Sequence, residues 1–234
     1  MKTNFLKILS VLFLALFIVT GCKKDKDNTP SVQYQAPSFA SNYQVVEVPT
    51  QLTSSEDVYA QMAGGYMAMA NAFASYSGYF NVPSNAVQSV TKSSGVIYTW
   101  SYGGITVKLT FDEDATFRYW VWYINGAKYM DCKESKLADS GSFNVYDIDN
   151  GGAAVLVYNW SKTGSAVDVT LKLIGSDSIF FKIHTSLDGK SGTFDLYEGS
   201  SESGIHILNV TWNITGGTWW INLDGETYSG SWTN

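Results

Sequence analysis

Residues 167–173 read Val-Asp-Val-Thr-Leu-Lys-Leu, with an apolar side chain at every second position and a polar one between. Successive side chains of a β-strand point to opposite faces, so this stretch predicts a strand with one apolar and one polar face. The same alternation recurs at residues 105–111 and 208–214. Such strands are typical of an antiparallel sheet that packs on one side and meets water on the other.

Further stretches rich in aromatic and β-branched residues raise the expected number of strands to about ten: 96–102, 117–124, 142–147, 153–160, 179–184, 193–198 and 218–223. We also expect a short first strand at 43–48. Glycine-containing hairpin turns connect the strands, at Asn125-Gly126, Asp149-Asn150-Gly151-Gly152, Asp188-Gly189 and Asp224-Gly225. The sequence therefore predicts a mainly β fold, an antiparallel meander that curls into a half-barrel or closes into a barrel.

Two of these turns lead into similar segments. Residues 191–194 read Ser-Gly-Thr-Phe, and residues 229–232 read Ser-Gly-Ser-Trp. Their distances from the preceding Asp-Gly turns differ by two residues. We interpret the pattern as the same type of turn used twice. The unequal spacing does not support an internal duplication.

One amphipathic helix is expected before the sheet. Ser54 or Ser55 can cap it, and two acidic residues in its first turn suit the helix dipole. Gly64 and Gly65 each cost about 1 kcal/mol relative to Ala, so the pair indicates close backbone packing or a bend. We expect the helix to pack on the apolar face of the sheet through side chains spaced three or four residues apart: Val58, Met62, Tyr66, Met69 and Phe73.

The N-terminal residues predict secretion and lipidation. A basic start at Lys2 and Lys7 precedes an apolar run over residues 8–19, which is too short to span a bilayer and is typical of a signal peptide. Val19-Thr20-Gly21-Cys22 resembles the bacterial lipobox. That resemblance implies a signal peptide over residues 1–21, a diacylglycerol thioether on Cys22 and, usually, an acylated (palmitate-type) amino group.

The residues after the lipobox predict location. Lys23, in place of Asp, implies sorting to the outer membrane by the enterobacterial rule, and the charged run at 23–28 looks like the tether of Bacteroidota lipoproteins. Residues 22–42 are then the lipidated cysteine and a disordered tether, and residues 43–234 are the folded domain. The anchor leaves the domain either on the periplasmic face or on the cell surface.

The outline of a meander with one leading helix resembles the lipoprotein carriers of the LolA/LolB type. The resemblance is architectural, covers residues 43–234 and rests on no sequence motif. It implies a concave apolar sheet that holds a lipid-like ligand.

The charge, the cysteines and the histidines of the chain limit the partners and the chemistry that we expect. The chain has 15 basic and 21 acidic side chains and a formal charge of −6, so nucleic acid is not an expected partner. With Cys22 lipidated, Cys132 has no disulfide partner and is expected to be a buried, inert thiol. His184 and His206, the only two histidines, are expected to be solvated on strands. No catalytic or cofactor motif occurs, so we predict a protein that is not an enzyme and has no cofactor.

Aromatic residues are the compositional outlier, with 8 Trp, 15 Tyr and 12 Phe. Residues 117–124 are apolar on both faces, so their strand is either covered on both sides or exposed on one for binding. The candidate ligand-binding residues are Trp120, Trp122, Trp219 and Trp220. Asp147 and Asp149 are candidate calcium ligands, because they alternate as in calcium loops, although the same residues suit an ordinary tight turn.

Two functions follow from these residues. The first is an outer-membrane-anchored binding or carrier protein for an apolar ligand, because a one-sided sheet with a single helix can form a lipid pocket. The alternative is a surface glycan-binding or adhesion module that uses exposed Trp and Tyr side chains. The expected partners are the membrane, through Cys22, and a lipid or a glycan.

Overall fold

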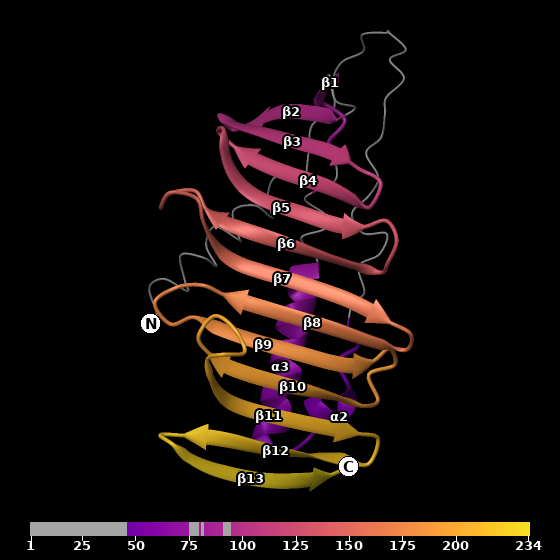
Figure 1. The fold of residues 1–234 in the computed structure, drawn as a ribbon, viewed down its shortest axis with the longest axis vertical. Coiled ribbons are helices and arrows are strands. Elements are labelled where there is room, and N and C mark those ends of the chain that lie inside the picture. Colours follow the sequence, from indigo (N-terminus) through magenta and orange to yellow (C-terminus); the bar gives the residue numbers. More distant parts are fainter. Residues whose placement is uncertain (1–45, 75–79, 81, 91–94) are drawn as a thin grey trace.

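The computed structural model describes residues 46–74, 80, 82–90 and 95–234 (Figure 1). Within them, two helices, α2 (Thr50–Thr53) and α3 (Val58–Ala74), precede thirteen strands. The strands are β1 (Val87–Val90), β2 (Val96–Tyr102), β3 (Ile105–Glu113), β4 (Phe117–Ile124), β5 (Ala127–Ser135), β6 (Ser140–Asp147), β7 (Ala153–Thr163), β8 (Ala166–Leu173), β9 (Ile179–Ser186), β10 (Gly192–Glu198), β11 (Ile205–Asn213), β12 (Gly216–Leu223) and β13 (Glu226–Thr233). The mainly β prediction is confirmed.

All thirteen strands form one antiparallel sheet in which each strand pairs with its sequence neighbours, from β1 at one edge to β13 at the other. The sheet does not close, so the predicted closed barrel is wrong. The ten expected strands are all present, and the sequence missed β1, β5 and β13. β1 is only four residues long, most of β13 is exposed, and two consecutive buried residues interrupt the alternation of β5.

The predicted hairpin turns are confirmed. Asn125 and Gly126 have φ values of 49° and 85°, and Asp224 and Gly225 have 54° and 87°. Two consecutive residues with positive φ form the type I′ turn, whose twist matches that of the flanking strands. These turns keep consecutive strands adjacent along the whole sheet (Figure 1).

Residues 46–48, the described part of the strand predicted at 43–48, do not join the sheet, so the prediction is wrong for them. Residues 43–45 lie outside the described residues. The Val46 N–H donates to Asn71 Oδ1 at 3.0 Å, and Asn71 Nδ2–H donates to the Val46 carbonyl at 2.6 Å. The Asn71 amide on α3 thus satisfies the backbone groups that a neighbouring strand would otherwise pair.

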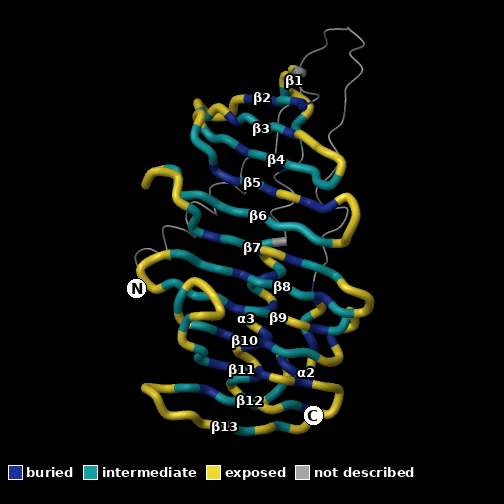
Figure 2. Tube along the Cα trace, in the orientation of Figure 1, coloured by how far each residue is buried: buried dark blue, intermediate teal, exposed yellow. Residues whose placement is uncertain are grey.

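The sheet has one apolar face because its register aligns the apolar positions of neighbouring strands. One row of cross-strand partners crosses eleven strands, and all of its members are buried (Figure 2). The row is Val96, Phe111, Trp120, Cys132, Phe143, Tyr158, Leu171, Phe181, Leu196, Leu208 and Ile221. Burial raises the pKa of the Cys132 thiol well above its usual value, which suits the predicted inert thiol.

Four tryptophans on the apolar face lie against glycines of the neighbouring strand. The pairs are Gly141 with Trp160, Gly192 with Trp212, Gly217 with Trp232 and Gly230 with Trp219. A Cβ added at Gly192 or Gly230 would stand 2.5 Å from Cζ2 of the facing indole. Each glycine therefore leaves the space that an indole fills, as in the aromatic rescue of strand glycines.

Helix α3 is capped by Asp57 and not by the predicted serines. Asp57 Oδ1 accepts the N–H groups of Tyr59 and Ala60 at 2.9 and 3.0 Å, which satisfies two donors of the first turn. Gly64 lies close to α2, where an added Cβ would stand 3.3 Å from Thr53 Cγ2, whereas Gly65 faces open space. The close backbone packing predicted for the two glycines is thus confirmed for Gly64 and is wrong for Gly65.

The predicted apolar stripe of α3 is wrong at its start, because Val58 is 61% and Met62 37% exposed. The fully buried positions are instead Ala60, Ala63, Met67 and Ala70. Small side chains let the helix approach the sheet behind β9–β12, so the buried stripe is offset from the one that larger apolar residues indicate (Figure 1).

Neither helix in the described part of the chain has the length and apolar character that a membrane span requires.

Candidate binding surface on the polar face of the sheet

The four candidate tryptophans do not share a face. Trp120 is fully buried and Trp122 is 5% exposed, both on the apolar face of β4. Trp219 lies between β12 and α3, where its Nε1–H donates to Asp57 Oδ2 at 2.7 Å. Trp220 is partly exposed on the opposite, polar face. Of the four candidates, the structure therefore places only Trp220 on the polar face.

Trp220 belongs to a row of aromatic rings on the polar face, contributed by four adjacent strands. Phe180 of β9 lies 5.8 Å from Tyr197 of β10, measured between ring centroids. The Tyr197 ring stacks on His206 of β11 at 4.2 Å with an interplanar angle of 17°. His206 meets Trp220 of β12 edge-on at 4.5 Å. We call these four residues the aromatic row.

A β-bulge places His206 in the aromatic row. Leu196 pairs with Leu208, but Tyr197 pairs with His206, so Ile207 is an extra residue in β11. Strict alternation from the buried Leu208 would have put His206 on the apolar face. Alternation alone therefore could not predict this contact, and bulges are frequent beside functional sites.

Hydrogen-bonding side chains border the aromatic row. Asp195 Oδ1 lies 2.9 Å from His206 Nε2 and accepts the Asn209 Nδ2–H at 2.8 Å. Lys182 Nζ forms an ion pair with Glu202 Oε1 at 2.9 Å. The row thus lies among a carboxylate, an amide and an ammonium group.

The tyrosine of the aromatic row is a hydrogen-bond donor at neutral pH. Burial, and then the negative charge of Asp195, raise the pKa of Tyr197 above its usual value, so its phenol stays protonated. Rings that offer apolar faces beside donors and acceptors can recognise a ligand that carries both C–H and O–H groups. The aromatic row and the polar groups around it provide both kinds of contact.

His184, the other histidine of the chain, lies apart from the aromatic row. His184 of β9 faces Asp168 of β8, with 2.7 Å between Nδ1 and Oδ1, and the two side chains are 57% and 48% exposed. The prediction of a solvated strand histidine is confirmed for His184. His206, at 30% exposure, is more enclosed than the sequence suggests.

The two candidate calcium ligands lie in the turn between β6 and β7. One oxygen of Asp147 accepts the N–H groups of Asp149 and Asn150 at 3.0 and 3.2 Å, and the other accepts Asn150 Nδ2–H at 2.6 Å. These bonds lower the pKa of Asp147, with the Asn150 amide contributing most. Among the described residues no three His, Cys, Asp or Glu side chains form a metal-binding group. Calcium binding here stays a prediction.

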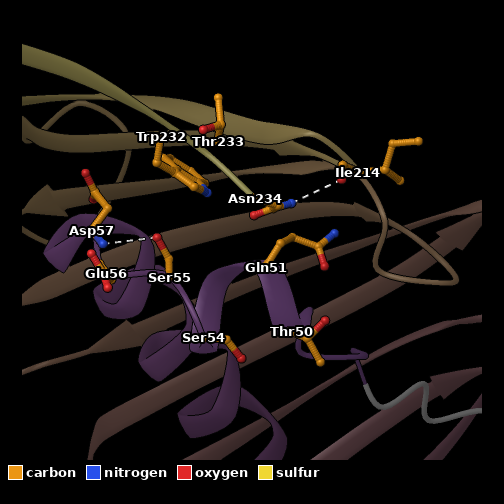
Figure 3. Close-up of a pocket in the computed structure, with 10 residues that line it drawn as sticks. All are labelled: Thr50, Gln51, Ser54, Ser55, Glu56, Asp57, Ile214, Trp232, Thr233 and Asn234. Atoms are coloured by element: carbon orange, nitrogen blue, oxygen red, sulfur yellow. Dashed lines mark hydrogen bonds between the residues drawn. The ribbon is translucent and has the colours of Figure 1, made fainter.

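A groove of about 650 Å³ lies beside the last strand (Figure 3). Its lining comes from α2, the link to α3, the turn between β11 and β12, and the C-terminal residues: Thr50, Gln51, Ser54, Ser55, Glu56, Asp57, Ile214, Trp232, Thr233 and Asn234. Several of its polar groups already bond within the chain, for example Asn234 Nδ2–H to the Ile214 carbonyl at 3.1 Å. Eight of its ten lining residues have polar side chains, and only Ile214 and Trp232 are apolar.

Sequence reasoning missed most of the aromatic row, naming only Trp220 as a ligand-binding candidate. Phe180, Tyr197 and His206 sit at separate points of three strands, and only the register brings them together. Comparison with known proteins adds no further guide: no protein-family model, curated protein or solved structure matches this chain.

Proposed function

We propose that this chain is a non-catalytic saccharide-binding protein anchored at the bacterial outer membrane. The single observation that supports the ligand class is the aromatic row, in which four consecutive strands each place a ring on the polar face. Sugar rings pack their C–H faces on aromatic side chains, and their hydroxyl groups bond to groups such as Asp195 and Asn209.

The apolar-ligand carrier predicted first from the sequence has weaker support. Such a carrier would need free space over the apolar face, but α3 occupies that face at β9–β12. The Tyr66 ring of α3 lies 5.3 Å from Phe181 and 5.2 Å from Phe194, and Ala63 and Met67 are fully buried. The likeness to LolA/LolB carriers therefore stays an architectural prediction.

The anchor is the second part of the proposal. Cys22, the signal peptide at 1–21 and the tether at 22–42 all lie outside the described residues, so their support is the lipobox-like Val19-Thr20-Gly21-Cys22 and Lys23. Two or more acyl chains hold a protein durably on a membrane. The domain would then reach its ligand from a lipid anchor.

Metabolic labelling with an alkyne fatty acid tests the anchor. Wild-type protein should take up the label and fractionate with the outer membrane, because the lipid is attached at Cys22. The Cys22→Ser variant should take up none, and Cys132→Ser, which keeps the lipobox, should label normally. Label retained in Cys22→Ser would remove Cys22 as the lipidation site.

A glycan array followed by titration calorimetry tests the ligand class. The lipidated protein in detergent should bind a defined set of saccharides, and Trp220→Ala should weaken that binding by about five- to twelvefold, as loss of a stacking contact worth about 1–1.5 kcal/mol implies. Tyr102→Ala is the matched control, because Tyr102 is 46% exposed and lies on β2, outside the aromatic row. Saccharide binding that survives both Trp220→Ala and Tyr197→Ala would remove the aromatic row as the site.

A further inference from the structure

A second group of aromatic and charged side chains lies on the polar face, at β3–β6. Lys108 Nζ stands 3.8 Å over the Tyr123 ring, and Lys128 Nζ stands 4.4 Å over the Tyr146 ring. Lys128 also forms an ion pair with Asp131, which accepts the Tyr146 hydroxyl at 2.8 Å. We call these five residues the tyrosine–lysine patch. Like the aromatic row, it combines ring faces with hydrogen-bonding groups.

The tyrosine–lysine patch and the aromatic row are built by the same backbone device. The sheet register shifts at three places, between Trp122 and Tyr123, between Val145 and Tyr146, and between Leu196 and Tyr197. A tyrosine of the polar face follows each shift. Bulges of this kind re-aim side chains and are frequent beside functional sites. In each case the extra residue lies in the paired strand, in β5, β7 and β11, so the bulge changes which residue faces the tyrosine. The recurrence of this arrangement indicates one extended surface.

The three register shifts lie at the same end of the strands, along one border of the sheet. Tyr123, Tyr146 and Tyr197 each lie near the end of their strand, in β4, β6 and β10. Alternate strands of an antiparallel meander run in the same direction, so these ends share one side of the sheet (Figure 1). The two binding groups therefore form a band that crosses the strands.

The distance between the two groups sets the size of a shared ligand. The nearest members of the two groups, Tyr146 of β6 and Phe180 of β9, lie three strands apart, which corresponds to about 14 Å at a strand spacing of about 4.8 Å. Between them, Lys172 of β8 faces Phe180, so a cation continues the band across the gap. A disaccharide cannot bridge this distance, but a linear chain laid across the strands can.

We infer that the ligand is a long linear polysaccharide that contacts the aromatic row and the tyrosine–lysine patch at once. This inference rests on the proposed function and adds the length and path of the ligand. Two linked contacts strengthen binding well beyond either alone, because the second becomes intramolecular. A short oligosaccharide or a single terminal sugar would use one group only.

Chain-length dependence tests the inference with the lipidated full-length protein in detergent. The probes are a disaccharide, a tetrasaccharide, an octasaccharide and the polymer of whichever glycan the array identifies. Affinity per chain should rise by about 100-fold once the chain can bridge both groups. Tyr146→Ala should remove most of that rise, and Trp220→Ala should weaken every probe that binds the row, whereas Tyr102→Ala should leave the affinity of all four probes unchanged.

Tyr123→Ala is a second variant of the tyrosine–lysine patch that keeps the Tyr146 contacts, and Tyr102→Ala is again the control. Thermal unfolding of each variant identifies any that fails to fold. Equal affinity for the disaccharide and the polymer, or polymer binding unchanged in both Tyr146→Ala and Tyr123→Ala, overturns the inference and leaves the aromatic row as a site for short glycans. Failure of the wild type to bind any saccharide overturns the proposed function, and the inference with it.

Discussion

The two faces of the sheet use aromatic side chains in opposite ways. On the apolar face, Trp212 lies against Gly192 of the neighbouring strand and is 1% exposed. On the polar face, Trp220 meets the His206 ring edge-on and stays partly exposed. Both cross-strand partners of Trp212 are glycines, Gly192 and Gly217, whereas those of Trp220 are Asn209 and Ser229. Aromatic content alone therefore cannot locate a binding surface.

The largest expected difference between the faces concerns stability. Trp212→Ala should lower the free energy of unfolding by about 4 kcal/mol, because it empties a buried site and leaves the Gly189 carbonyl, which accepts Trp212 Nε1–H at 2.9 Å, without that donor. Trp220→Ala should cost about 1 kcal/mol or less, the usual range for a surface substitution. Urea denaturation of both variants measures the contrast. Equal losses would mean that both faces are structural.

The glycine that faces Trp212 should also be sensitive. In Gly192→Ala the new Cβ would stand 2.5 Å from Trp212 Cζ2 and would overlap the His184 carbonyl, so we expect a loss of about 2–3 kcal/mol from overpacking. Gly175→Ala is the matched control, because nothing lies within 4 Å of a Cβ there and its φ is not in the left-handed region. The same denaturation experiment compares them, and a Gly192→Ala protein as stable as Gly175→Ala would contradict the pairing.

The smallest expected effect is a pH dependence in the turn that supports Trp212. Hydrogen bonds from Lys190, and then from Ser186, lower the pKa of Asp188 to about 2. A carboxylate with a lowered folded-state pKa stabilises the protein above its unfolded value near 4, and this stabilisation is lost as the pH falls towards 2. The Tm difference between wild type and Asp188→Asn should therefore shrink between pH 5 and pH 2. A difference that is constant with pH would contradict this assignment.

The local sequence pattern predicted ten strands, three from alternation of apolar and polar residues and seven from their aromatic and β-branched content. It failed for β13, which has almost no buried positions, and for β5, where a bulge makes Tyr129 and Met130 consecutive buried residues. It also failed on α3, because apolarity favours Val58 and Met62 whereas close packing selects Ala60 and Ala63. Periodicity records which residues are apolar, but not how near two elements approach.

One sequence signal could have predicted more of the fold. The triplet Gly-(Ser/Thr)-(Phe/Trp) occurs four times, at residues 141–143, 192–194, 217–219 and 230–232, and each of its glycines faces a tryptophan. The aromatic row had no comparable signal, because a bulge and the register of four strands assemble it from residues far apart in sequence. Strand pairing determines such a site, so the spacing of residues in the sequence does not predict it.

Pairing only between sequence neighbours has a consequence for how such a molecule can change over evolution. Removing or inserting one hairpin would change the partners of only the two flanking strands, as in repeat proteins, where each unit contacts only the next. The polar face could therefore lengthen or shorten in steps of two strands, about 10 Å each, without a new fold. If the proposed polysaccharide binding holds, the number of strands would set the length of the polymer that the polar face contacts.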